Sequence, residues 1–227
     1  MGIESRNIIG FDFSEGSGKT FQGVNPASNT MISEHFFIAT PADVNTAMQK
    51  AKESFNTYRA TSWGERANFL EMIAVEIDNL GEELVKRASD ETGLPHARII
   101  GERGRTTGQL CMFAEYIRTG NWVEATIDTA LPERQPIPKQ DLRKMLIPLG
   151  PVIVFGASNF PLAYSVAGGD TAAALAAGCP VIVKAHAGHP GASAMVGQAI
   201  VTAAKKQICL MVSFLYYSIM AFPLVRH

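Results

Sequence analysis

The sequence predicts an α/β fold in which helices cover a parallel β-sheet. Two short apolar runs rich in β-branched residues, at 152–155 and 181–183, are typical of fully buried strands. The alanine-rich segment between them predicts a helix with Pro161 at its first position and Gly178 as its C-cap. A second helix is expected over residues 190–205. Strand, helix, strand and helix in this order form the repeating unit of a parallel α/β sheet.

Size and composition indicate a soluble globular protein. The chain has 227 residues, of which 47% are hydrophobic and 18% are charged, which is enough for a sizeable core. The net charge of −1 gives no electrostatic basis for binding nucleic acid or an anionic membrane. Three cysteines argue against a disulfide framework and favour a reducing compartment. No signal-peptide pattern is present at the start, so we expect a cytoplasmic protein.

A glycine-rich segment, Gly16-Ser-Gly-Lys-Thr20, resembles the end of a phosphate-binding P-loop. The complete pattern places another glycine at position 13, where this chain has Phe13. No buried strand precedes the segment and no apolar helix follows it. We therefore interpret it as a polar turn, with a P-loop nucleotidase as an alternative.

Four helices are predicted between Thr40 and Arg118. Thr40 is the expected N-cap of the first, and Ser62 with Glu65 forms a capping box for the second. The third covers residues 81–92 and the fourth covers residues 95–118. The residues expected to face the core are Val44, Ala47, Met48, Ala51, Phe55, Phe69, Leu70, Ile73, Ile77, Leu80, Ile99, Leu110, Phe113 and Ile117. Four charged residues are expected on solvated faces: Glu82, Lys86, Glu102 and Arg105.

A polar excursion of strands and loop is expected over residues 121–145, which include three prolines. Residues 143–148 then lead as a strand into the central segment. In that segment Asn159 follows the first predicted strand and Lys184 ends the second, and ligands of parallel sheets bind beyond these strand ends. The Asn159 amide suits an oxygen that gains negative charge, and the Lys184 ammonium suits a ribose or phosphate oxygen.

Two motifs at this position carry a resemblance to a known family. They are Pro-Val-Ile-Val-Phe-Gly-Ala-Ser-Asn-Phe-Pro at residues 151–161 and Ala-Ala-Gly-Cys-Pro-Val-Ile-Val-Lys at residues 176–184. The pair is similar to the NAD(P)-dependent aldehyde dehydrogenase superfamily, which usually has Trp-Asn-Phe-Pro and then Ala-Gly-Asn-x-Val-Val-x-Lys-Pro. Ser158 and the Ala185-His186 pair depart from that form and resemble the α-ketoglutaric semialdehyde dehydrogenase subgroup. The resemblance runs from about Val24 to Lys206.

The resemblance implies an aldehyde-dehydrogenase-like fold, with a helical shell, an incomplete Rossmann-like parallel sheet and a small β excursion. Residues 1–120 would hold the hairpin and helices of the cofactor domain, with hairpin strands at 21–24 and 31–38. Residues 121–145 would form an excursion of the kind that mediates subunit contacts, and residues 146–206 a βαβα half of the dinucleotide fold. A homo-oligomer, or pairing with a full-length relative, is expected on this basis.

The same resemblance implies the roles of the site residues. Asn159 would be the oxyanion donor toward a small-molecule aldehyde. Many NAD-preferring relatives carry a glutamate where this chain has Ala187, so NADP should be tolerated as well as NAD. The cofactor contacts implied are Phe155, Ala157, Ser158, Lys184, His186 and Ala187.

The nucleophile of this reaction has no obvious candidate. Cys111 and Cys179 are expected to be small buried hydrophobic residues, and Cys209 lies in an atypical tail. The string Gly-Gln-x-Cys occurs only as Gly108-Gln-Leu-Cys111, inside the fourth predicted helix, and Glu-Leu-Gly-Gly occurs nowhere in the sequence. The resemblance implies that the family's catalytic cysteine and general base fall beyond residue 227. We therefore expect the amino-terminal part of an aldehyde dehydrogenase that is inactive by itself. The alternative is a non-catalytic truncated paralogue that binds nucleotide or another subunit.

Two further features leave alternatives open. His186 and His189 have the spacing of a metal pair, but no carboxylate or thiol lies near them in sequence, and lining an adenosine pocket is the preferred interpretation. Residues 207–227 break the α/β pattern, and residues 208–225 carry no charge. Codons read one base out of register can produce such a tail from the family's usual continuation, so we favour a frameshift product over a membrane anchor.

Overall fold

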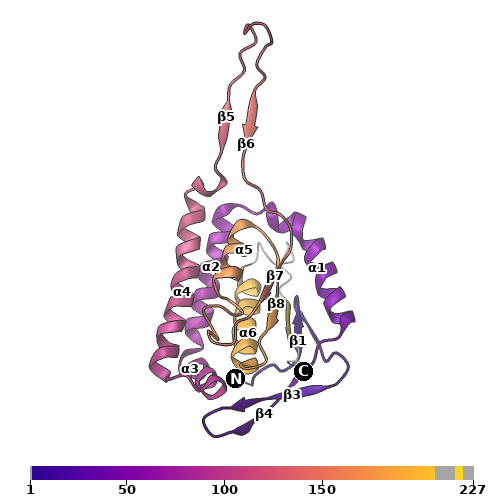
Figure 1. The fold of residues 1–227 in the computed structure, drawn as a ribbon, viewed down its shortest axis with the longest axis vertical. Coiled ribbons are helices and arrows are strands. Elements are labelled where there is room, and N and C mark those ends of the chain that lie inside the picture. Colours follow the sequence, from indigo (N-terminus) through magenta and orange to yellow (C-terminus); the bar gives the residue numbers. More distant parts are fainter. Residues whose placement is uncertain (1, 208–217, 222–227) are drawn as a thin grey trace.

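The computed structural model describes residues 2–207 and 218–221. Within them lie a five-stranded sheet, two hairpins and a set of helices that pack on the sheet (Figure 1). The strands are β1 (Asn7–Ile9), β2 (Asp12–Ser14), β3 (Thr20–Asn25), β4 (Thr30–Phe37), β5 (Thr126–Asp128), β6 (Leu142–Lys144), β7 (Val152–Phe155), β8 (Val181–Ala185) and β9 (Ser218–Ala221). The helices are α1 (Pro41–Arg59), α2 (Trp63–Asn79), α3 (Gly81–Thr92), α4 (His96–Arg118), α5 (Gly169–Ala177) and α6 (Pro190–Lys206), with a short 3₁₀ helix, η1 (Asn121–Val123).

The five-stranded sheet has the strand order β2-β1-β9-β8-β7. The predicted parallel pair is confirmed, because β7 runs parallel to β8 with Val152 opposite Val181 and Phe155 opposite Lys184. β8 also pairs in parallel with β9, whereas β1 pairs antiparallel with β9 and with β2. The sequence patterns did not predict β1 or β2.

Burial differs between the two predicted strands. β8 is covered on both faces, since Val181 and Val183 lie in the main core while Ile182 packs with Ala47 and Ala51 of α1. β7 is buried on one face only: Ile153 is 47% exposed and Phe155 is 72% exposed. The prediction of full burial is therefore wrong for β7, because no described element covers the face that carries these two side chains.

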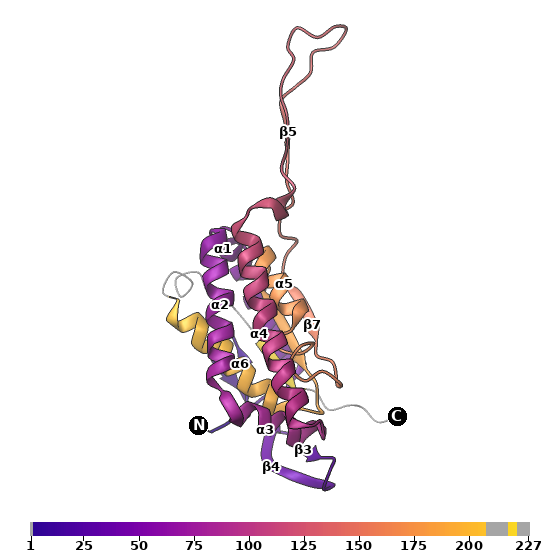
Figure 2. The same ribbon diagram turned by 90° about the vertical axis from the view of Figure 1, so that its left-hand side faces the viewer.

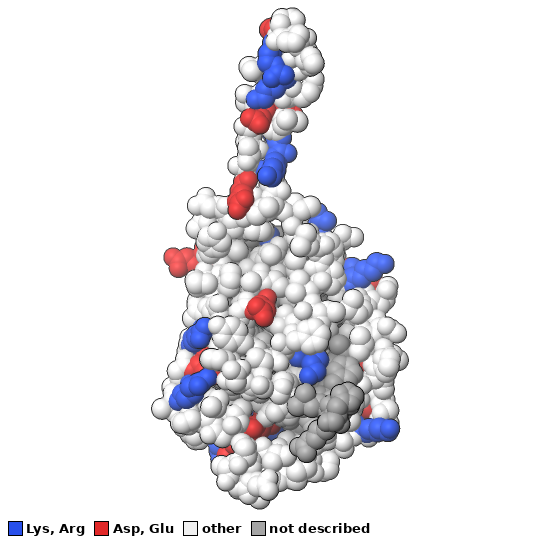
Figure 3. All heavy atoms as spheres, in the orientation of Figure 1, with Lys and Arg blue, Asp and Glu red and all other residues white. Residues whose placement is uncertain are grey.

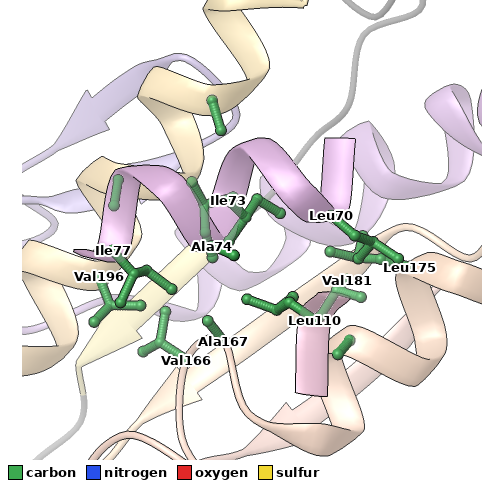
Figure 4. Packing of buried hydrophobic residues seen from close by; sticks show 14 of the residues in the cluster. Leu70, Ile73, Ala74, Ile77, Leu110, Val166, Ala167, Leu175, Val181 and Val196 are labelled. Carbon is green, nitrogen blue, oxygen red and sulfur yellow. The ribbon is translucent and has the colours of Figure 1, made fainter. Parts of the chain in front are cut away.

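The main core lies between the sheet and a layer of helices centred on α2. In Figure 4, Leu70, Ile73, Ala74 and Ile77 of α2 meet Leu110 of α4, Val166, Ala167, Leu175 of α5, Val181 of β8 and Val196 of α6. Figure 2 shows α2 and α4 running side by side on this face of the molecule. Amphipathic helices are stabilised mainly by such packing of their apolar faces.

The predicted helix ends of the shell are confirmed. Thr40 with Asp43 and Ser62 with Glu65 form capping boxes, and Gly93 ends α3 in the left-handed region at φ 71°. The buried face of α1 differs from the predicted one, because Met48, which was expected to face the core, is 39% exposed. Ala47 and Ala51 of α1 face the sheet instead, where they pack with Ile182 of β8. The buried residues of α1 are Asp43, Ala47, Ala51, Ser54 and Tyr58.

The helix expected to begin at Pro161 begins eight residues later, at Gly169. Residues 161–168 form successive turns, and α5 ends at Gly178 with φ 92° as predicted. Within these turns the backbone bonds span three residues, from the Ser165 amide to the Leu162 carbonyl and from the Gly168 amide to the Ser165 carbonyl, rather than the four of an α-helix. The predicted start was therefore wrong, because Gly168 is extended, with φ −70° and ψ −174°, and separates the turns from α5.

The hairpins of the structure agree with the predictions. β3 pairs antiparallel with β4, and the Gly16–Thr20 segment is an exposed turn between β2 and β3. β5 pairs antiparallel with β6 in a long arm that projects from the body (Figure 1). β6 ends at Lys144, so most of the strand expected over residues 143–148 is irregular. Charges of both signs are scattered over the face in Figure 3.

The tail predictions fall mostly outside the described residues. Of residues 208–227 only β9 is described, and the choice between a frameshift product and an anchor concerns the rest. In the described ranges, no helix combines the length and the apolar character needed to cross a membrane.

Two buried side chains of the shell bind the carboxyl end of α5. The Tyr58 hydroxyl donates to the Leu175 carbonyl at 2.8 Å, and Nη1 of Arg66 donates to the Ala176 carbonyl at 2.9 Å. The last carbonyls of a helix have no partner within the helix and attract cations, so these contacts satisfy α5 where it turns into β8.

We expect Tyr58→Phe to lower the free energy of unfolding by about 1 kcal/mol, because the buried Leu175 carbonyl loses one of its two donors and keeps only the Gly178 amide, at 3.0 Å. Urea titration of the full chain measures this. Tyr116→Phe is the matched control, since Tyr116 is 50% exposed on α4, and it should change stability by less than about 0.5 kcal/mol. Equal effects of the two substitutions would contradict the assigned role of the Tyr58 hydroxyl.

Candidate active site

The loop that follows β7, residues 156–168, is anchored at its beginning to β8. The amide of Gly156 donates to the Lys184 carbonyl at 3.0 Å, which extends the parallel ladder by one bond. The amide of Ala157 then donates to the Tyr164 carbonyl at 2.8 Å, which closes the loop on itself. Asn159 therefore lies on a short segment whose start is fixed to the sheet.

Glu102 of α4 anchors the middle of the same loop. Its Oε1 accepts hydrogen bonds from the amides of Leu162 at 2.9 Å and Ala163 at 3.0 Å, and the residue is 5% exposed. The expectation that Glu102 lies on a solvated face is therefore wrong. A carboxylate can be buried at this position because it satisfies two backbone donors that would otherwise have no partner.

Two arginines flank Glu102 on α4 and contact the aromatic side of the loop. Arg98 donates to the Asn159 carbonyl at 3.3 Å, and its guanidinium lies 4.8 Å from the centroid of the Phe160 ring. Arg105 donates to the Tyr164 hydroxyl at 2.7 Å. Phe160 and Tyr164 pack edge to face at 5.1 Å. Arg105 is exposed as expected, but its guanidinium also holds the loop.

Asn159 lines a pocket of about 520 Å³ between the loop and α4. The residue is exposed, and within the described part of the chain its carboxamide has no hydrogen-bond partner. The amide N–H₂ is thus available to an oxygen in the pocket. The lining residues are Thr92, Leu94, Arg98, Ser158, Asn159 and Phe160. Ser158, which the resemblance assigns to the cofactor, faces this pocket together with Asn159.

Four of the other residues assigned to the cofactor gather at the carboxyl ends of β7 and β8. Phe155 lies opposite Lys184 in the parallel register, and His186 and Ala187 follow in the turn before α6. Ala157 joins them through a ring nitrogen of His189, which lies 2.8 Å from the Ala157 carbonyl. The structure therefore brings these residues, which the resemblance assigns to the cofactor, together at one edge, which we call the nucleotide edge after that prediction. Ser158 and Asn159 line a separate pocket.

The charge at the nucleotide edge is cationic. Lys184 is half-buried, and burial lowers the pKa of its ammonium group. Burial, and then the charge of Lys184, lower the pKa of His186, whose Nδ1 accepts the Gly188 amide at 3.0 Å. No carboxylate pairs with Lys184 among the described residues. This set of groups fits a phosphorylated ribose, with Lys184 as the available cation and Ala187 leaving space.

His186 and His189 do not form a metal site in the part of the chain described. No cluster of three or more His, Cys, Asp or Glu side chains suited to a metal occurs there. The rings stack at 5.5 Å with an interplanar angle of 28°. His189 is 0% exposed, so it cannot line a pocket directly, whereas the partly buried His186 can.

The start of α6 is held by a second buried carboxylate. Glu91 of α3 accepts the amides of Gly191 at 2.7 Å and Ala192 at 2.9 Å, and Arg87 pairs with it at 2.9 Å. Burial raises the pKa of Glu91. A Cβ at position 191 would lie 2.1 Å from Nε of Arg87, so this position needs glycine. An acid at a helix N-terminus is favourable because the first amides there lack partners.

Neither of the two cysteines in the described residues lines the pocket beside Asn159. Cys179 is 4% exposed and precedes β8, as predicted, so it lies at the opposite end of the parallel pair from Asn159. Cys111 is exposed on α4, so the expectation of burial is wrong for it. Burial, Glu71 and Asp78 raise the pKa of the Cys111 thiol, which disfavours a thiolate. Cys209 lies outside the described residues.

Comparison with known proteins identifies the family. The model of the aldehyde dehydrogenase family matches residues 13–210. The chain belongs to the aldehyde dehydrogenase family. Alpha-ketoglutaric semialdehyde dehydrogenase 2 of Azospirillum brasilense is 52% identical over 207 residues, which are 91% of this chain and 39% of that protein. Alpha-ketoglutaric semialdehyde dehydrogenase of Acinetobacter baylyi is 52% identical over 181 residues, which are 80% of this chain and 34% of that protein. The chain thus spans little more than a third of these relatives.

Solved structures show the same aldehyde dehydrogenase fold. An aldehyde dehydrogenase from Brucella melitensis superposes with a TM-score of 0.82 at 22% identity, covering 97% of this chain and 42% of that one. Aldehyde dehydrogenase 21 from Physcomitrella patens, in complex with the reaction product succinate, superposes with a TM-score of 0.80 at 22% identity, covering 99% of this chain and 44% of that one. The predicted fold class is thereby confirmed.

Sequence reasoning missed the anchors of the aldehyde dehydrogenase loop. A signal for Glu102 was present, because Ile99, Thr106 and Leu110 share its helical stripe and are all buried. A charged residue within a buried stripe indicates a paired side chain rather than a solvated one. No local pattern indicates that Glu91 and Arg87 contact α6, since Glu91 and Gly191 are a hundred positions apart.

We expect Glu102→Ala to lower the free energy of unfolding by about 3 kcal/mol, because two buried amides lose their acceptor. Glu115→Ala, at an exposed position of the same helix, should cost less than about 0.5 kcal/mol. Urea titration of both variants and the unmodified chain measures the difference. A Glu102→Ala chain as stable as the control would show that the loop does not depend on this carboxylate.

Proposed function

We propose that this chain supplies the oxyanion donor and the first half of the nucleotide site of an NAD(P)-dependent aldehyde dehydrogenase. The observation that carries the proposal is the unpartnered carboxamide of Asn159 in a pocket beside the strand ends that hold Lys184. The 52% identity to two alpha-ketoglutaric semialdehyde dehydrogenases supports an α-ketoglutaric semialdehyde type of substrate.

The chemistry proposed for Asn159 follows from its donor group. When a thiolate adds to an aldehyde, the carbonyl oxygen becomes an oxyanion, and an amide N–H₂ held in place stabilises that charge. Loss of one such donor typically costs about 10²–10³ in rate. A bound nicotinamide cofactor would supply the hydride acceptor, and Lys184 and His186 would hold its phosphorylated ribose.

The 227-residue chain contains no Glu-Leu-Gly-Gly element, and its one Gly-Gln-x-Cys string ends at Cys111, which is exposed on α4 and does not line the pocket beside Asn159. We propose that this polypeptide by itself binds nucleotide weakly and does not oxidise aldehydes. Cys179 cannot substitute as the nucleophile, because it precedes the amino end of β8 whereas Asn159 follows the carboxyl end of β7. A strand of this length separates its two ends by roughly 17 Å, which is too far for both groups to reach one carbonyl.

A non-catalytic role in subunit pairing is the second candidate function. The uncovered face of β7, with Ile153 and Phe155, and the projecting β5–β6 arm, with Ile137 68% exposed, favour an interaction with another chain. The partner proposed is a full-length relative or a second copy, in the cytoplasm. Co-purification with an intact aldehyde dehydrogenase would support this role, and a stable isolated monomer would count against it.

For the nucleotide, we expect weak binding with NADP favoured at least as much as NAD. Ala187→Glu should weaken NADP binding by about tenfold and NAD binding much less, because a carboxylate repels the 2′-phosphate. Ala130→Glu on the exposed arm is the matched control and should change neither affinity. Titration calorimetry measures these affinities, and tight NAD binding with NADP excluded would contradict the proposal.

For activity, we expect no aldehyde oxidation by the purified chain. The assay follows NADH and NADPH formation with α-ketoglutaric semialdehyde and simple aldehydes, in protein free of host dehydrogenases. Turnover that disappears in a Cys179→Ala variant would show that Cys179 acts as the nucleophile, and would contradict its placement at the opposite end of the β7–β8 pair from Asn159. Nucleotide binding without turnover is the expected result.

A further inference from the structure

We propose that His189 is a positioning residue, which fixes the loop that carries Asn159 by donating a hydrogen bond from Nε2 to the Ala157 carbonyl. The inference rests on the proposed role of Asn159 as the oxyanion donor. The hydrogen bond and its effect on the loop can be tested without measuring turnover.

The contact joins a buried ring to a partly buried carbonyl, and its direction is fixed by chemistry. Nε2 of His189 lies 2.8 Å from the Ala157 carbonyl oxygen, and the His189 side chain is 0% exposed. A carbonyl only accepts hydrogen bonds, so Nε2 must carry the hydrogen. Nδ1 lies 3.1 Å from Oγ of Ser193, one helical turn along α6, and in a neutral ring it accepts from that hydroxyl.

The surroundings keep the ring neutral. Burial lowers the pKa of His189 to about 4, and His186 and Lys184 on the neighbouring turn add to this effect. At neutral pH only one ring nitrogen therefore carries a hydrogen, and the Ser193 hydroxyl is free to satisfy the other. The arrangement selects a single tautomer.

The position of Ala157 explains why this bond matters for Asn159. Ala157 precedes Asn159 by two residues, and its amide donates to the Tyr164 carbonyl at 2.8 Å. With the His189 bond, the amide and the carbonyl of Ala157 are both occupied. Further along the loop, the Asn159 carbonyl accepts one hydrogen bond, at 3.3 Å, from the exposed Arg98. The contacts with Glu102 begin only at Leu162. His189 is thus the buried constraint nearest to Asn159 on its amino-terminal side.

An apolar residue could fill the same volume but could not provide this bond. Catalytic donors must be held within roughly 0.5 Å of their productive positions by neighbouring contacts. The Ala157 carbonyl without its partner would be a partly buried acceptor that lacks a donor, and the loop would gain other conformations. His189 also stacks on His186, so one ring joins the nucleotide edge to the Asn159 loop.

The first test is spectroscopic and uses the unmodified full chain. Long-range ¹⁵N–¹H correlation spectra report which ring nitrogen of each histidine carries a hydrogen. We expect the Nε2–H tautomer for His189 at pH 7. The Nδ1–H tautomer, or a mixture of the two, would overturn the proposal without any substitution.

The second test compares His189→Leu with His189→Gln, whose side-chain amide can donate from a position similar to Nε2. We expect the Ala157 amide to exchange about tenfold faster in His189→Leu, with a lower ¹⁵N order parameter at Asn159, while the Leu70 amide of α2 is unchanged. His189→Gln should restore both values. The matched control is His96→Leu at an exposed position, which should alter neither.

Two outcomes of this comparison would overturn the proposal. One is an equal increase in the hydrogen-exchange rates of the Ala157 and Leu70 amides, which would indicate a general loss of stability rather than a loss of positioning. The other is the same behaviour of the leucine and glutamine variants. Nucleotide affinity, measured in parallel, reports on the proposed function separately, because Lys184 and Ala187 are unchanged in every variant.

Discussion

The structure depends on buried side chains of the helical shell that satisfy backbone groups of the α/β unit. Glu102 accepts the amides of Leu162 and Ala163, Glu91 accepts those of Gly191 and Ala192, and Arg66 donates to the end of α5. Each contact joins residues at least sixty positions apart in sequence. Backbone donors and acceptors buried without a partner are costly, so these side chains determine where the loop and both helices can lie.

The region around Asn159 departs from regular secondary structure. Glu102 accepts the amides of Leu162 and Ala163, which fixes this part of the loop on α4. The chain then makes turns up to residue 168, because Gly168 is extended and α5 begins only at Gly169. The turns hold Phe160 and Tyr164 against the arginines of α4, and they leave the Asn159 carboxamide exposed in its pocket.

The same loop separates two kinds of ligand contact. Its first residues adjoin the carboxyl ends of β7 and β8, where Lys184 supplies a positive charge beside His186. Its next residues face α4, where the pocket beside Asn159 is lined partly by apolar side chains. One short segment thus adjoins the Lys184 charge at its start and holds the neutral Asn159 carboxamide in a pocket a few residues later. This division agrees with membership of the aldehyde dehydrogenase family.

The sequence by itself determined the features that local chemistry controls. Capping residues such as Thr40 and Ser62 placed helix starts, Gly93 and Gly178 placed helix ends, and β-branched runs placed β7 and β8. Two motifs at the strand ends were enough to indicate the family. These signals need only neighbouring residues, because caps, turns and periodicity act over a few positions.

Only the tertiary structure decided which polar residues are buried and which apolar residues are not. Glu102 and His189 are buried because Leu162 and Ala157 bring backbone partners to them, and no local sequence pattern identifies those partners. Phe155 looks like a core residue in sequence, yet it is exposed because no described element packs on its side of β7. Burial is a property of the assembled neighbours, so the sequence predicted the elements, whereas packing decided their faces.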